Sequence, residues 1–451
     1  MSSGATADSG SAPGRLDLSR DFLLRQLGAL FSFETTIVLF LFAGIYKEDA
    51  RFAWIPGDIT VLTFGLSFIC GVYLIVRRGL VFRREAVIIT GMAILFVIWA
   101  LLSYLWSPSI NYSLRKVALL GSLTLWPLAA FALIVSHERL RVRRFFVVLV
   151  LFSLWIATES AVALLLAARS GIRGFVTTSL STNYLGLGRV IGPGMLVLVA
   201  WYVYFLRGFW QRLFGAGAIG MYSILMLGIG SRGPFLAMCI ACLYIVLVNL
   251  RPARNIRQIT LRLLVGMAAF CLVGGVVFYF ATSGAELPRT LERLQEAQEE
   301  GFEGSTRFGG YATTWSRVDE SPLWGRGIGS WPVLTGRGDI RAYPHNIFLE
   351  VFFELGIIGL VLFFCMLFYA WRLIPSRRVL QSEPWMTLTI AQLGSAFINA
   401  NISGDLNDNK LFWAFLGMMA VCALRRPLPA SSGRTADAAV PALPAQPSIS
   451  S

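Results

Sequence analysis

The sequence predicts an all-α, polytopic integral membrane protein. Hydrophobic residues make up 56% of the 451 residues and charged residues only 14%, whereas a soluble domain carries about 25% charged residues. Apolar runs of roughly 20 residues, each long enough to cross a bilayer core as a helix, recur along the chain. We expect about twelve transmembrane helices, near residues 29–45, 59–76, 86–105, 117–136, 145–168, 190–206, 213–229, 234–250, 261–281, 346–371, 384–402 and 411–424.

Composition divides the chain into five parts. Residues 1–24 and 427–451 are rich in Ser, Ala, Gly and Pro, so we expect disordered tails, and the first tail lacks the features of a removable signal peptide. Residues 25–281 hold the first nine expected helices, and residues 346–426 hold the last three. Between them, residues 282–345 form a large loop domain with an expected amphipathic helix from Pro288 to Glu300. A loop this long that keeps aromatic residues and glycines is typical of a functional segment.

The arginines predict the topology. The net charge of +14 comes almost entirely from arginine, because lysine occurs only at Lys47, Lys116 and Lys410. Most arginines fall in alternate loops and in both tails, and the positive-inside rule places that side in the cytoplasm. Both termini are then cytoplasmic, and the 282–345 loop is external or periplasmic. Because the charge is scattered between membrane spans, it does not indicate nucleic-acid binding.

The sequence gives no indication of a metal or another cofactor. All six cysteines lie inside apolar runs, and the Cys239-x-x-Cys242 pair has no partner pair or histidine nearby. We interpret these cysteines as small apolar residues of helices. Walker A, H-E-x-x-H and G-x-S-x-G motifs are absent from the sequence.

The segment Tyr343-Pro344-His345-Asn346 opens the tenth expected helix. His345 is one of only two histidines, and an imidazole that titrates near neutral pH at a membrane surface is a natural proton acceptor. Asn346 is a favoured helix-capping residue. We therefore treat His345 as a candidate general base.

A second candidate is the tight connection Gly230-Ser231-Arg232-Gly233-Pro234. Proline suits the first turn of a helix, so Arg232 is expected beside a helix N-terminus with free N–H groups. Arginine and the helix dipole together favour an anion such as phosphate. Two helix N-termini, an imidazole and further arginines on one face would make a site for a diphosphate.

Other polar features leave alternatives open. Glu34 and Glu159 lie within expected spans, where a carboxylate is either functional or paired with a nearby arginine or tyrosine. The polar turn from Ser403 to Lys410 would either hold sugar hydroxyls or simply connect two helices. Gly356 and Gly359 lie one turn apart and are expected to permit close helix packing.

Two spaced motifs carry a family resemblance. Arg232 and Leu236 are separated by three residues, and His345-Asn346 is followed after nine residues by Gly356-Ile-Ile-Gly359. In this order they resemble the O-antigen ligase and O-antigen polymerase superfamily of bacterial envelope glycosyltransferases. Ser305-Thr306-Arg307 and the segment 321–329 also look like loop segments of that family. The resemblance covers roughly residues 185–372.

The resemblance implies a GT-C-like, metal-independent, inverting transferase in the bacterial inner membrane, with its active site at the periplasmic face. Its donor would be an undecaprenyl-diphosphate-linked oligosaccharide. Carried over, Arg232 and Arg307 would bind the donor diphosphate, and His345 would orient or deprotonate the acceptor hydroxyl. Further substrate-binding residues are expected at Asn346, Ser231, Arg326, Arg189 and Asp405.

The resemblance leaves the acceptor open. Polymerisation of O-antigen or exopolysaccharide repeat units is our first expectation, since the 403–410 turn resembles that of exopolysaccharide polymerases. A ligase that transfers glycan to lipid A-core is the alternative, and a flippase for lipid-linked sugars, drawing on Glu34 and Glu159, belongs to another class. The expected partners are the lipid-linked donor, a glycan or glycolipid acceptor, the lipid bilayer and proteins of a polysaccharide export pathway.

Overall fold

All regular structure in the described part of the chain is helical. The computed structural model describes residues 32–47, 49–78, 82–170, 184–250, 292 and 306–424. Eight helices there are long and apolar enough to cross a membrane, so the protein is an all-helical, polytopic membrane protein. The number twelve stays a prediction. Both tails, the expected span at 261–281 and, apart from residue 292, the expected helix from Pro288 to Glu300 lie outside the described residues.

The helices follow the chain in two groups. The first comprises α2 (Phe33–Tyr46), α3 (Ile59–Arg78), α4 (Arg84–Ser103), α5 (Asn111–Leu119), α6 (Leu125–Leu133), α7 (Arg139–Ser170), α8 (Tyr184–Tyr204), α9 (Phe209–Ile229) and α10 (Arg232–Asn249). The second comprises α14 (Thr306–Trp315), α15 (Trp331–Leu334), α16 (Ile347–Arg372), α17 (Arg377–Ser382), α18 (Pro384–Ala400) and α19 (Lys410–Met418).

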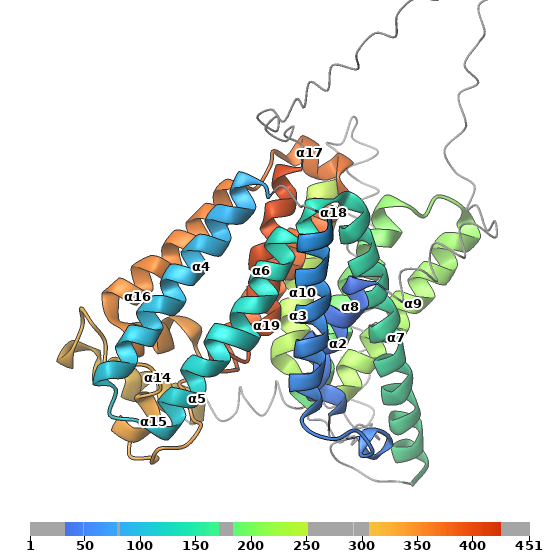
Figure 1. Ribbon diagram of the computed structural model, residues 1–451. Coiled ribbons are helices and arrows are strands. Elements are labelled where there is room, and N and C mark those ends of the chain that lie inside the picture. The colour runs from blue at the N-terminus through green and yellow to red at the C-terminus, as the bar shows by residue number, and fades with distance from the viewer. Residues whose placement is uncertain are drawn as a thin grey trace, which may run out of the picture.

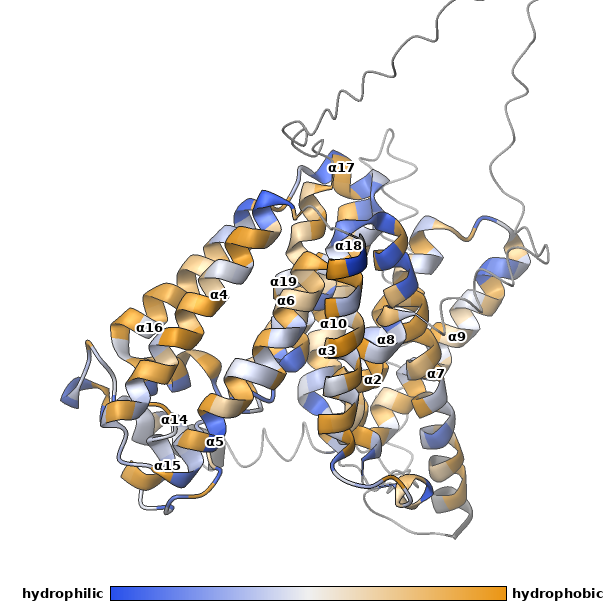
Figure 2. Ribbon diagram, viewed as in Figure 1, coloured by the Kyte–Doolittle hydropathy of each residue, from blue (hydrophilic) through white to orange (hydrophobic). Residues whose placement is uncertain are grey.

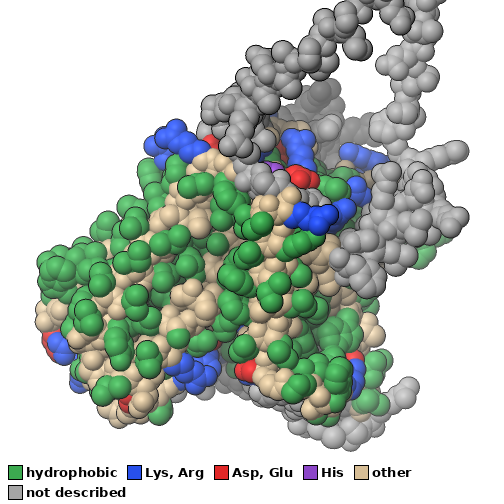
Figure 3. All heavy atoms as spheres, in the orientation of Figure 1, with side chains coloured by type: hydrophobic (Ala, Val, Ile, Leu, Met, Phe, Trp, Pro, Cys, Tyr) green, Lys and Arg blue, Asp and Glu red, His purple; other side chains and the backbone are tan. Residues whose placement is uncertain are grey.

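The two groups interleave in space. Helix α19 packs on α6, α18 packs on α10, and α16 packs beside α4 (Figure 1). Helix middles are apolar and helix ends polar (Figure 2), and on the face shown in Figure 3 the lysines and arginines gather toward the two ends. Helix α17 lies at one end of the bundle, and α5, α14 and α15 lie at the other. Helix α17 and the helices α14 and α15 of the expected external loop therefore lie at opposite ends of the bundle.

Helix α5 begins at Asn111, earlier than the expected start of this span at residue 117. Its cap comes from a distant part of the chain. One carboxylate oxygen of Asp339 accepts the N–H of Asn111 at 2.8 Å, and the other accepts the N–H of Tyr112 at 3.0 Å and the Ser109 hydroxyl at 2.6 Å. Because the helix starts early, Lys116 lies inside it and is fully buried. A π-helical turn at Leu120–Thr124 then joins α5 to α6.

Helix α16 is broken at Gly356, which has a φ of 65°. The loop before α15 supplies the hydrogen bonds lost at the break. Arg326 donates its N–H to the Phe353 carbonyl at 2.9 Å, and the N–H of Ile357 donates to Pro322 at 2.8 Å. The interpretation of Gly356 as a glycine of close helix packing is therefore wrong, because it is the point where one helix stops and the next begins.

Glycine is required on both sides of the contact between the break in α16 and the loop before α15. A Cβ added at Gly356 would lie 2.3 Å from the Leu323 carbonyl oxygen, and one added at Gly325 would lie 2.4 Å from the Glu354 oxygen. Both positions also have a positive φ, which residues with a side chain rarely adopt. Gly325 and Gly356 thus allow the backbone of the loop before α15 to touch the backbone of α16.

We predict that Gly356→Ala destabilises the fold by about 1–3 kcal/mol or more, because it adds backbone strain and a steric clash. The measurement is the midpoint of thermal unfolding in detergent. Gly91→Ala in α4 is the control, since no atom lies within 4 Å of the added Cβ there. An unchanged midpoint for Gly356→Ala would show that the break tolerates a side chain.

Candidate functional site

Several residues singled out in the sequence meet at the turn between α18 and α19, residues 401–409, here called the 401–409 turn. The turn is largely buried, and Asp405 and Leu406 have at most 1% of their surface exposed. Its carbonyl groups accept hydrogen bonds from other helices. Asn401 accepts from the Tyr311 hydroxyl at 3.4 Å, and Ser403 accepts from Arg189 at 2.7 Å. Helices α8 and α14 are therefore tied to one short segment.

Helix α16 begins beside the same turn. As the sequence predicts, Asn346 caps α16, because its side-chain oxygen accepts the N–H groups of Phe348 and Leu349 at 3.0 and 3.1 Å. Its side-chain nitrogen donates to the Asn401 carbonyl at 3.5 Å. Asn346 thus links the start of α16 to the 401–409 turn.

His345 precedes that cap in an unusual conformation. It is the one non-glycine residue with a positive φ, 62°, in the described part of the chain. Its carbonyl accepts from the Tyr311 hydroxyl at 3.3 Å, and its ring packs edge-on against Tyr343 with 4.6 Å between centroids. Such strain costs about 1–3 kcal/mol and is found most often at functional sites. The imidazole of His345 is half-buried.

Helix α10 approaches the turn with its N-terminus. As the sequence predicts, Arg232 is the first residue of that helix, and Ser231 precedes it. Ser231 is buried and its hydroxyl donates to the Tyr184 carbonyl. A Cβ added at Gly233 would lie 3.2 Å from Ile402, so the start of α10 packs against the 401–409 turn.

Two other expected site residues have different surroundings. Arg307 is the second residue of α14, one turn before Tyr311, and its side chain is outside the described part. Arg326 lies at the break of α16, where it pairs with Glu320 at 2.8 Å. The break at Gly356 is ten residues after Asn346, about 15 Å along the helix. The structure therefore places Arg326 away from the 401–409 turn.

Asp405 belongs to the turn but faces inward. Its carboxylate accepts a hydrogen bond from the Tyr112 hydroxyl and lies 3.3 Å from the Lys116 ammonium. Although burial raises the pKa of Asp405, Lys116 and hydrogen bonds from Glu350 and Tyr112 hold that pKa below its usual value. Asp405 is fully buried and does not reach a substrate while the turn keeps this conformation.

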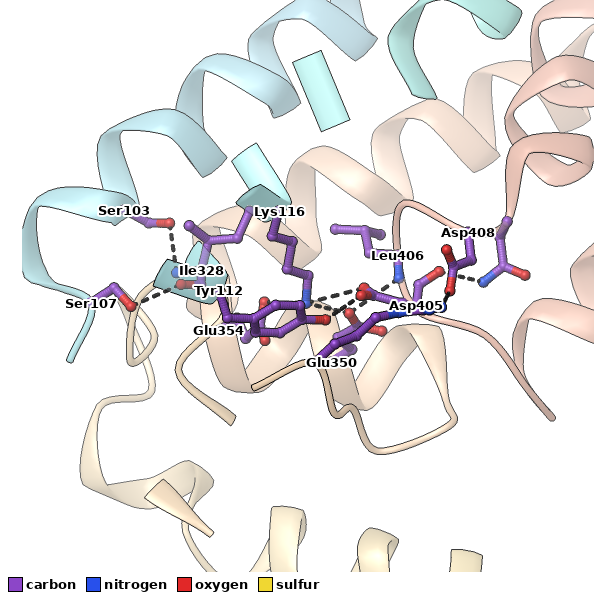
Figure 4. Close-up of polar contacts among 12 residues, drawn as sticks. Ser103, Ser107, Tyr112, Lys116, Ile328, Glu350, Glu354, Asp405, Leu406 and Asp408 are labelled. Carbon is purple, nitrogen blue, oxygen red and sulfur yellow. Dashed lines mark hydrogen bonds and ion pairs between the residues drawn. The ribbon is translucent and has the colours of Figure 1, made fainter. Parts of the chain in front are cut away.

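The charged cluster around Lys116 was not predicted from the sequence. The Lys116 Nζ lies 2.5 Å from Glu350 Oε1 and 2.8 Å from Glu354 Oε2, and all three residues are fully buried (Figure 4). Glu350 also accepts the N–H of Leu406 at 3.1 Å. One sequence feature could have revealed the cluster: two glutamates four residues apart in an apolar span, in a chain with only three lysines.

The two carboxylates that the sequence places in expected spans, Glu34 and Glu159, have arginine partners. Glu34 pairs with Arg141 at 3.0 Å, and Glu159 pairs with Arg51 at 2.7 Å. Of the two interpretations left open for them, the structure shows ion pairing. In the described ranges, no three His, Cys, Asp or Glu side chains are grouped to hold a metal ion.

The fold and a family comparison together define the class of protein: a multi-pass membrane protein of polysaccharide biosynthesis. Residues 216–364 match the family model described as O-antigen ligase, a family of glycosyltransferase-like ligases and polymerases. This matched segment includes Arg232, Arg307 and His345, and the match confirms the resemblance over these residues. A search of curated proteins found no match.

We predict that Asp339 makes the fold acid-sensitive. Hydrogen bonds from Ser109 and from the N–H groups at the start of α5 lower the pKa of Asp339 from 3.8 to about 2. The ionised group therefore stabilises the fold fully above its usual pKa, and this stabilisation is lost as the pH falls through about 2.

Unfolding midpoints of the wild type and Asp339→Asn, measured between about pH 5 and pH 2, test this. The wild type should be more stable at pH 5, and its advantage should shrink toward pH 2. An advantage that does not change with pH would contradict the assigned role.

Proposed function

We propose that the protein is a membrane glycosyltransferase that polymerises O-antigen or exopolysaccharide repeat units. It would join an undecaprenyl-diphosphate-linked oligosaccharide to an acceptor at the periplasmic face. One observation supports the proposal: the starts of α10 and α16, both inside the segment 216–364 that matches the O-antigen ligase model, pack on the 401–409 turn. Those two helix starts bring Arg232 and His345, respectively, toward one region.

The donor diphosphate would bind at the start of α10. The Arg232 guanidinium and the positive end of the helix dipole at the start of α10 both favour an anion there. Arg307, one turn before Tyr311 in α14, would supply a second guanidinium. As the glycosidic C–O bond breaks, negative charge develops on the departing diphosphate, and these groups would stabilise it.

The acceptor hydroxyl would be activated by His345. The imidazole takes the hydroxyl proton while the acceptor oxygen attacks the anomeric carbon from the side opposite the diphosphate, which inverts the configuration. The new C–O bond forms as the bond to diphosphate breaks. General-base catalysis of this kind contributes about 10²–10⁴-fold to a rate.

A ligase that transfers glycan to lipid A-core is the second candidate, favoured by the description of the matching family as O-antigen ligase. It shares the donor chemistry, so the proposed site is the same. Product analysis separates the two. In a knockout strain, single lipid-linked repeats indicate a polymerase, and long chains not joined to core indicate a ligase. Transport was suggested by Glu34 and Glu159, whose ion pairs with arginines account for their burial.

We predict that His345→Ala lowers the glycan-transfer rate by about 10²–10⁴-fold. Arg232→Lys should lower it by roughly tenfold or more, because lysine keeps the charge but loses the planar fork that binds phosphate oxygens. Purified protein in lipid nanodiscs with a lipid-linked donor gives the rates. His137→Ala, which removes the chain's other histidine, is the control and should leave the rate unchanged. Normal transfer by His345→Ala would exclude it as the base.

We predict that residue 340 is accessible from outside intact cells. Ile340→Cys, in a background without the natural cysteines, should react with a membrane-impermeant maleimide, because Ile340 is 60% exposed in the expected periplasmic loop. Ser376→Cys is exposed just before α17, at the opposite end of the bundle. It should react only after permeabilisation. The reverse pattern would place the proposed site in the cytoplasm.

A further inference from the structure

The cluster around Lys116 joins three separate parts of the chain. Lys116 belongs to α5, Glu350 and Glu354 to α16, and Asp405 to the 401–409 turn (Figure 4). Glu350 lies one helical turn after Asn346, the cap of α16. The cluster therefore fixes where α16 begins relative to the turn, although none of its members is exposed.

The charges of the cluster make it sensitive to the loss of its one cation. Three carboxyl groups surround a single ammonium, and burying unneutralised charge is strongly unfavourable. Removing Lys116 would leave the remaining negative charge without a partner in the cluster.

Lysine suits this position better than arginine. An ammonium has three N–H donors that point in different directions, and here three carboxyl groups from three segments lie around it. A guanidinium is planar and larger, and its donors match one carboxylate side by side. The geometry thus favours a compact charge that holds three segments together.

We propose that Lys116 is a positioning residue for glycan transfer, holding the start of α16, and with it His345, in place against the 401–409 turn. The catalytic consequence rests on the proposed function. Arg189 binds the Ser403 carbonyl of that turn, and the start of α10 packs on Ile402. A shift of the turn would therefore move Arg189 and the start of α10 relative to the His345 imidazole.

Hydrogen exchange measured by mass spectrometry, on the full chain in nanodiscs, tests the positioning directly. In Lys116→Met, the amides of residues 401–409 should exchange at least tenfold faster than in the wild type. The transfer kcat should fall at least tenfold. Arg141→Met is the matched control, because it removes the cation of another buried ion pair, with Glu34. It should leave exchange in the 401–409 turn unchanged.

A milder variant keeps the test decisive if Lys116→Met does not fold. Tyr112→Phe removes only the hydroxyl that bonds Asp405, and it should raise exchange in the turn and lower kcat in the same direction. A folded Lys116→Met or Tyr112→Phe protein with wild-type exchange in the turn, or with wild-type kcat, would overturn the proposal.

Failure of the proposed function would look different. Wild-type protein would form no glycosidic bond, while Lys116→Met would still loosen the 401–409 turn. That result would contradict a role of Lys116 in glycan transfer. It would still show that Lys116 keeps the 401–409 turn in place.

Discussion

A single ammonium group, buried among three carboxyl groups, is the constraint on which the candidate site depends. Charges that are out of water must stay close to their partners, so α5, α16 and the 401–409 turn are held in one arrangement by Lys116. The turn then accepts hydrogen bonds from α8, α14 and α16. The elements that carry Arg189, Arg232 and His345 are brought together in this way, although they are far apart in sequence.

The break at Gly356 complements this constraint. The first half of α16 carries the capped start and the buried glutamates, whereas the second half continues as an apolar helix. The loop around Gly325 bonds to both sides of the break. The same loop packs against α5 and the residues before it, since a Cβ at Gly329 would lie 2.8 Å from Ser113. The Lys116 cluster and the backbone contact between Gly325 and Gly356 thus attach α16 to its neighbours at two points along the helix.

The sequence predicted those features that depend on nearby residues. Apolar runs predicted the helical membrane fold, Pro234 the start of α10, and Asn346 the cap of α16. Features that depend on distant residues were not predictable. The cap of α5 is Asp339, 228 residues from Asn111, so nothing local indicated the early start that buries Lys116. Glu350 and Glu354 were overlooked in an apolar span, and the burial of the polar 401–409 turn was not predicted because its partners lie on other helices.

The most direct test is a cryo-electron microscopy structure in nanodiscs with undecaprenyl diphosphate bound. The account predicts the diphosphate at the start of α10, with its oxygens about 3 Å from the Arg232 guanidinium, and the His345 ring facing the side where the sugar would lie. A diphosphate bound away from the 401–409 turn, or Arg232 and His345 facing separate spaces on either side of it, would contradict the account.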